Sequence, residues 1–208
     1  MQPRICLGIP SGDMVHGRFM LDTLALVLHS KDLNIDTINY RSSRITGNRN
    51  GIVEAAYRYQ ATHVMFIDAD MTFPRNGLLE LLRHDKDIVC ATATKREEGE
   101  NGPIGLPLTL GEATTNKRLI QMKFVGMPFM LIKMGVFDKL AKPYFAEPII
   151  DGELVPEDDY FCKTALEAGF DIWCDLALSM QMGHMGVKEY KIASVQQRKP
   201  ELRVVGAA

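Results

Sequence analysis

The stretch VMFIDADMTFP, residues 64–74, decides how the fold is interpreted. Its first four residues are apolar and strand-like, and two carboxylates, Asp68 and Asp70, follow immediately. A buried strand that runs directly into two aspartates places charged side chains where that strand leaves the sheet.

The first 95 or so residues alternate between strand-like and helix-like segments. Short apolar runs bounded by turn residues indicate buried strands, and apolar residues at a spacing of three and four indicate amphipathic helices. This alternation predicts βαβ units, and hence a Rossmann-like, mainly parallel α/β sheet flanked by helices. The predicted strands are 4–10, 33–40, 62–68 and 87–93, the predicted helices are 17–30, 50–61 and 75–84, and residues 41–50 are predicted to form a polar loop.

The second half of the chain is less regular. It contains apolar segments at 117–126 and 128–134 that resemble antiparallel or mixed strands, a short helix within 135–145, a helix at 156–170 and a strand at 171–175. We predict one domain over 1–208, with a nucleotide-binding half (1–95), an acceptor and catalytic half (96–186) and a C-terminal tail (187–208).

Composition narrows the class of protein. The chain has 208 residues, of which 46% are hydrophobic and 24% charged, and this balance is typical of a globular domain. Its formal net charge of -2 makes a nucleic-acid partner improbable. Its four cysteines form no CxxC pair, and its apolar runs are too short for a signal peptide or a transmembrane segment. We therefore expect a cytoplasmic protein with buried thiols.

Two carboxylates separated by one residue can bind one hard cation, and Mg²⁺ and Mn²⁺ prefer such oxygen ligands. The same pattern also occurs as an ordinary turn or helix cap. Three other features favour the metal interpretation. Arg49 and Asn50 lie where a helix is predicted to begin, and Glu157 and Asp158 open a second helix. His184 lies between Gly183 and Gly186, and such flanking glycines let a backbone come close to a ligand.

These motifs, in this order, resemble the nucleotide-sugar-dependent glycosyltransferases of the GT-A fold, close to the family-2 type. The matching segments extend over residues 5–186. They read GIPSGD, RNGIVEAA, THVMFIDADMTFP, GMPFMLIKMGVFDKL, PEDDYFCKTALEAGFDIWCD and HMG.

The resemblance implies a role for each motif. Asp68 and Asp70 would form the DxD motif that holds Mn²⁺ or Mg²⁺ against the donor diphosphate, and His184 would be a third ligand. Pro10, Ser11, Arg49 and Asn50 would surround the nucleotide of a UDP- or GDP-sugar, together with Asp68. An acidic residue of the segment 157–159, Asp158 with Glu157 beside it, would be the general base for an acceptor hydroxyl in an inverting reaction.

Two alternatives stay open at this point. A sugar-phosphate nucleotidyltransferase also uses acidic metal ligands on an α/β sheet, although GIPSGDMVHGR only faintly resembles the glycine-rich, basic loop of those enzymes. A non-catalytic nucleotide- or carbohydrate-binding module of the same fold is the other, because the chain is short for a glycosyltransferase.

Overall fold

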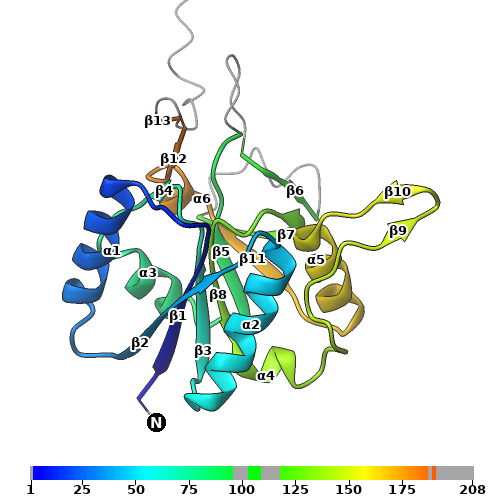
Figure 1. Cartoon of the computed structure of the whole chain (residues 1–208), viewed down its shortest axis with the longest axis horizontal. Coiled ribbons are helices and arrows are strands. Elements are labelled where there is room, and N and C mark those ends of the chain that lie inside the picture. The colour runs from blue at the N-terminus through cyan, green and yellow to red at the C-terminus, as the bar shows by residue number, and fades with distance from the viewer. Residues whose placement is uncertain (1, 96–102, 109–117, 187–188, 191–208) are drawn as a thin grey trace, which may run out of the picture.

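The computed structural model describes residues 2–95, 103–108, 118–186 and 189–190. Its centre is an eight-stranded sheet with helices on both faces (Figure 1). In their order across the sheet the strands are β2 (Asn34–Arg41), β1 (Arg4–Ser11), β3 (His63–Ile67), β8 (Phe129–Lys133), β5 (Ile88–Ala91), β11 (Ile172–Asp175), β7 (Leu119–Val125) and β6 (Gly105–Pro107).

The α/β class is confirmed, but the sheet is mixed rather than mainly parallel. Strand β1 pairs in parallel with β2 and β3, and β5 pairs in parallel with β11. The pairs β3–β8, β5–β8, β11–β7 and β6–β7 are antiparallel. The departure arises from two strands of the second half of the chain: β8 inserts between β3 and β5 and runs against both, and β7 runs against β11.

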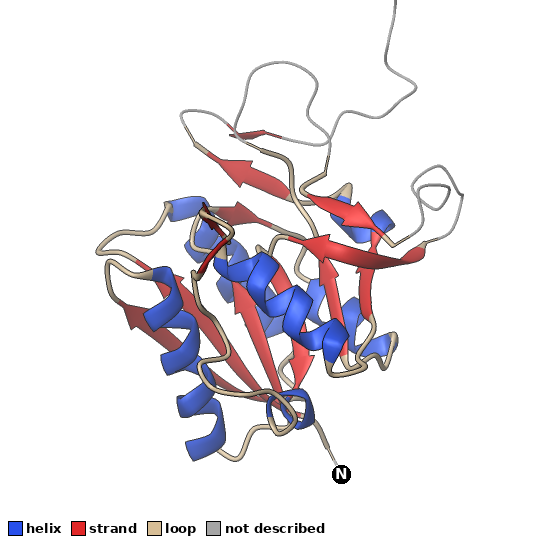
Figure 2. Cartoon of the chain, turned by 90° about the vertical axis from the view of Figure 1, so that its right-hand side faces the viewer, coloured by secondary structure: helices blue, strands red, loops and turns tan. Residues whose placement is uncertain are grey.

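Helices cover each face of the sheet over a separate apolar core. On one face α1 packs Phe19 and Leu26 with Leu78 of α3, and on the other α2 packs Ile52 with Phe161 of α5. Figure 2 shows the second layer in front of the strands. The helices are α1 (Gly17–His29), α2 (Ile45–Arg58), α3 (Gly77–Arg83), α4 (Met134–Phe137), α5 (Glu157–Glu167) and α6 (Leu176–Ser179).

Helix α2 begins at Ile45, five residues before the start predicted from the sequence. Its first turn has no side-chain cap on the N-terminal residue, Arg44. Instead the carbonyl oxygen of Ser42 accepts a hydrogen bond of 3.1 Å from the Asn48 side chain, which ties the entering chain to the helix. The polar segment 41–50 therefore does not remain a loop, and Arg49 lies one turn inside the helix on its buried side.

Two small sheets complete the fold. Strand β12 (Gly183–Met185) pairs antiparallel with β4 (Met71–Thr72) and with β13 (Glu189–Tyr190). Strands β9 (Ile149–Ile150) and β10 (Glu153–Leu154) form a hairpin that projects from the body of the domain (Figure 1).

All four cysteines are buried and free, as the sequence predicted for Cys6, Cys90 and Cys174. None of the helices within the described ranges has the length and apolarity needed to cross a bilayer. Most of the predicted C-terminal tail, 187–208, lies outside the described residues.

Candidate functional site

A cavity of about 530 Å³ opens where β1 and β3 leave the sheet. It collects residues from β1, α2, the β3–β4 turn, the start of α5 and β12. Seven of the nine site residues expected from the sequence line it, namely Pro10, Ser11, Arg49, Asp68, Asp70, Glu157 and His184. The parallel pairing of β1 with β3 accounts for this convergence, because it brings the carboxyl ends of both strands to the same edge.

Arg49 is the buried centre of the site. Its side chain is 3% exposed, and its guanidinium lies 5.5 Å from the centre of the Phe66 ring. Nη2 donates to Asp68 Oδ1 at 3.0 Å and Nε donates to Glu157 Oε1 at 3.3 Å. One cation from α2 thus links the aspartate after β3 to the first residue of α5. Nη1 is buried and has no hydrogen-bond partner among the described residues.

Asp70 and His184 lie next to each other in the lining of the same cavity. Strand β12 pairs with β4, and the backbone N–H of Met185 donates to the Asp70 carbonyl at 2.6 Å, so the two residues are held together by backbone contacts. His184 Nε2 lies 3.3 Å from Asp70 Oδ2, and Nδ1 lies 2.8 Å from the carbonyl oxygen of Thr94. Because a carbonyl oxygen can only accept, this contact places a proton on Nδ1 and directs Nε2 toward the carboxylate.

The three expected metal ligands are therefore divided in this structure. Asp68 faces Arg49, whereas Asp70 faces His184. Within the described part of the chain, no group of three or more His, Cys, Asp or Glu side chains is arranged to hold a metal ion.

The electrostatic balance at the β3–β4 turn favours a further positive charge. Burial raises the pKa of Asp68 above its ordinary value, and although Arg49 opposes this shift, the carboxylates of Asp70 and Glu157 add to it. Two carboxylates thus contact the one guanidinium, and the charge of a third, Asp70, acts on Asp68. The turn itself is fixed, because the Asp68 N–H donates to the Pro128 carbonyl at 3.0 Å.

Asp158 does not line the cavity and lies behind Glu157, on the first turn of α5. Its Oδ2 would be 3.7 Å from a Cβ placed on Gly126, an ordinary van der Waals distance, so the carboxylate lies beside this glycine. Burial raises the pKa of Asp158 to about 6, and the neighbouring Glu157 carboxylate contributes. A carboxylate with a pKa near 6 can accept a proton more readily than an exposed one.

Asn50 also lies outside the cavity, and its side chain has another role. Its Oδ1 accepts from the backbone N–H groups of Tyr144 and Phe145 at 3.0 and 3.3 Å, and its Nδ2 donates to the Phe145 carbonyl at 2.8 Å. Both ends of the amide are thus used to join α2 to the segment that follows α4.

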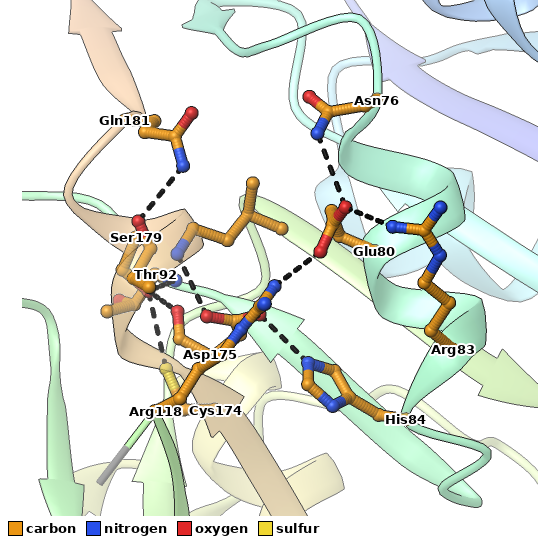
Figure 3. A network of polar contacts seen from close by, with 12 residues as sticks. Asn76, Glu80, Arg83, His84, Thr92, Arg118, Cys174, Asp175, Ser179 and Gln181 are labelled. Carbon is orange, nitrogen blue, oxygen red and sulfur yellow. Dashed lines mark hydrogen bonds and ion pairs between the residues drawn. The ribbon is translucent and has the colours of Figure 1, made fainter.

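A second network, whose residues do not line the cavity, holds the segment that leads to His184 (Figure 3). Asp175 is fully buried. Its Oδ2 accepts a hydrogen bond of 2.8 Å from Arg118 Nη2 and lies 2.8 Å from His84 Nε2. Its Oδ1 accepts a hydrogen bond of 2.9 Å from the Leu178 N–H and so caps α6. Burial alone would raise the pKa of Asp175, but the hydrogen bonds from Arg118 and His84 hold it below its ordinary value. The network fixes α6, and the chain then passes directly into β12.

The sequence did not single out several residues that line or support the cavity. Gly12, His16 and Ala69 line it, and each lies just beyond the carboxyl end of β1 or β3, where the βαβ pattern could have indicated them. Thr94, which positions His184 through its backbone carbonyl, carried no such signal because any residue supplies that group.

No family model matches the chain, and no curated protein matches it. Among solved structures, it is similar to A197 from STIV, known from a crystal structure, with a TM-score of 0.59 and 14% sequence identity. The superposition covers 94% of this chain and 100% of that one. At this level of identity the likeness shows a shared fold alone.

Proposed function

We propose that the protein is a metal-dependent glycosyltransferase of the GT-A type, which moves a sugar from a nucleotide-sugar donor to an acceptor hydroxyl with inversion. The observation that carries the proposal is the contact of Asp70 with His184 in the cavity that is also lined by the buried Arg49. A ligand bound there would contact an oxygen–nitrogen metal-binding pair and a guanidinium at the same time.

Asp70 and His184 suit a divalent ion such as Mn²⁺ or Mg²⁺. With its proton on Nδ1, Nε2 of His184 would donate a lone pair to the ion, and Asp70 Oδ2, which lies 3.3 Å from Nε2, would supply an oxygen ligand. When bound, the ion would stabilise the negative charge that grows on the leaving diphosphate. Asp68 would complete the DxD motif from its position beside Arg49.

The cavity suits a nucleotide-sugar such as a UDP- or GDP-sugar. Its volume of about 530 Å³ lies within the usual range for small-molecule sites. Pro10 and Ser11 would lie beside the nucleotide, and Ser11 is held by a contact of 2.9 Å between its hydroxyl and Asn39 Oδ1. Nη1 of Arg49 has no hydrogen-bond partner among the described residues. It therefore indicates an acceptor supplied from elsewhere, such as an oxygen of the nucleotide-sugar or a water molecule.

Asp158 would be the general base. Its raised pKa suits a carboxylate that takes a proton from an acceptor hydroxyl. Glu157 would act on the donor side, because it lines the cavity and shares Arg49 with Asp68.

The experiment is a thermal-shift screen of nucleoside diphosphates and their sugars, with and without Mn²⁺, on the wild type and on Asp70→Asn. We expect one nucleotide to stabilise the wild type only when Mn²⁺ is present, and this stabilisation to be lost in Asp70→Asn. The control is Asp171→Asn, since Asp171 is an exposed aspartate remote from the cavity lining. Equal stabilisation of the wild type and Asp70→Asn would remove Asp70 from the metal site.

Product analysis with the same nucleotide separates the two alternatives. Pyrophosphate release from a sugar phosphate and a nucleoside triphosphate would favour the nucleotidyltransferase. Metal-dependent binding without transfer or hydrolysis of any donor would favour the binding module.

A further inference from the structure

Helix α1 exposes an apolar stripe that the candidate site does not explain. Met20, Leu21, Leu24 and Leu28 are 50%, 58%, 53% and 72% exposed, and they lie along the outer side of the helix. A helix at the surface of a globular domain normally presents polar residues there. Contiguous exposed apolar residues of this kind mark a contact surface.

The stripe continues into a groove beside the edge of the sheet. The groove has a volume of about 170 Å³ and lies between Met20 and Leu24 of α1, Ile9 of β1 and Asn39 of β2. The apolar stripe of α1 therefore lies next to β2 and is exposed to solvent.

Strand β2 is an edge strand. It is eight residues long and pairs with β1 on one side, and it ends the strand order of the sheet on the other. The backbone N–H and C=O groups along that outer side can bind another strand. A partner that fits both features must offer an extended strand next to an apolar helix.

The charges on this surface favour a second copy of the chain over a membrane. The acidic, lysine and arginine residues of α1 are Arg18 and Asp22, and these form an ion pair of 2.9 Å. The helix is therefore close to neutral, so two copies of it can meet without repulsion. Helices that lie on anionic membranes instead carry several lysines or arginines on the polar side.

We propose that two copies of the chain associate about a two-fold axis at β2, with antiparallel β2–β2 pairing and the α1 stripes packed against each other. A two-fold axis perpendicular to the sheet keeps both α1 helices on the same face. Directly opposed residues of the two β2 strands then point to the same face, so one residue of β2 opposes its own copy on the axis. Full overlap of the strands, which run from Asn34 to Arg41, puts either Thr37 or Ile38 there.

Neither register opposes like charges. With Thr37 on the axis, Asp36 lies opposite Ile38, and with Ile38 on the axis, Asp36 lies opposite Tyr40 and Arg41 lies opposite Ile35. Leu24 lines the same groove as Asn39 of β2, so it is the residue of the stripe chosen to test the contact. The β2 edge and the helix stripe thus support the same symmetric arrangement.

The test is the mass of the full chain in solution, measured by light scattering over a wide range of concentration. The wild type is expected at twice the 23.3 kDa of one chain, and Leu24→Asp is expected to raise the dissociation constant at least about tenfold. Ile149→Asp, at a residue that is 73% exposed on the β9–β10 hairpin, is the matched control and should remain dimeric. A monomeric wild type, or a Leu24→Asp variant that dimerises as well as the control, would overturn the proposal.

Two further readouts test the geometry. Leu24→Cys should be cross-linked to a dimer by a short bis-maleimide, since the natural cysteines are buried, whereas Ile149→Cys should not. Amides of β2 should exchange faster with solvent in Leu24→Asp than in the wild type. Cross-linking through Ile149→Cys, or unchanged exchange in β2, would place the contact elsewhere.

Discussion

Removing the guanidinium of Arg49 should destabilise the protein strongly and in a pH-dependent way. Arg49 is 3% exposed and contacts Asp68 and Glu157 at 3.0 and 3.3 Å. Arg49→Met keeps an apolar side chain against Phe66 but leaves both carboxylates without their cation. Removing one partner of a buried ion pair costs about 3–5 kcal/mol, which corresponds to a decrease in Tm of roughly 6–20 °C for a domain of this size.

The sign of the pH dependence follows from Asp68. Burial already raises its pKa in the folded state, and loss of Arg49 raises that pKa further. The charged carboxylate then costs stability above its unfolded-state pKa and costs nothing once it is protonated. The deficit of Arg49→Met should therefore be largest near neutral pH and should decrease as the pH is lowered.

Urea denaturation between pH 5 and pH 8 measures this difference. The matched control is Arg58→Met, because Arg58 is exposed at the end of the same helix. Its free energy of unfolding should stay within about 0.5 kcal/mol of the wild type. If Arg49→Met were as stable as this control, or if its deficit were the same at every pH, the assignment of Arg49 as the charge link of the site would be wrong.

Three other substitutions test neighbouring parts of the account. Asp158→Asn should be more stable than the wild type by about 1–2 kcal/mol above pH 6 and no more stable below pH 4, because the pKa of Asp158 is raised to about 6 and its charged form costs stability; equal differences at both pH values in urea denaturation would contradict this. Asp175→Asn should cost about 2–3 kcal/mol at pH 7, because it weakens the contacts to Arg118 and His84. That cost should decrease as the pH falls through the lowered pKa of Asp175, and a loss independent of pH would contradict the sign. Asn50→Ala should reduce Tm without reducing Mn²⁺-dependent nucleotide binding, and selective loss of binding would instead return Asn50 to the donor site.

The sequence predicted the elements better than their arrangement. Local apolar patterns located most strands and helices, and the βαβ rule brought Ser11, Asp68 and Asp70 to one edge. The place of β8 between β3 and β5 could not be predicted, because which strands become neighbours depends on the packing of the whole sheet.

The same holds for the site residues: their chemistry could be predicted from the sequence, but their contacts could not. The type of each residue indicated its chemistry, but its partner depended on contacts far along the chain. Asn50 binds backbone groups of Tyr144 and Phe145, 94 and 95 residues away, and Arg49 contacts Glu157 over 108 residues. Polar residues at the start of α2 looked like loop residues because the helix lacks the usual cap, so the burial of Arg49 could not be predicted from the local sequence.

The most direct test of the proposed metal centre is anomalous diffraction at the manganese edge from a crystal grown with Mn²⁺ and the nucleoside diphosphate that stabilises the protein. The account predicts a peak within about 2.0–2.3 Å of both an Asp70 carboxylate oxygen and His184 Nε2, with a diphosphate oxygen also bound. A nucleotide that occupies the cavity with no anomalous peak beside Asp70 and His184 would contradict it.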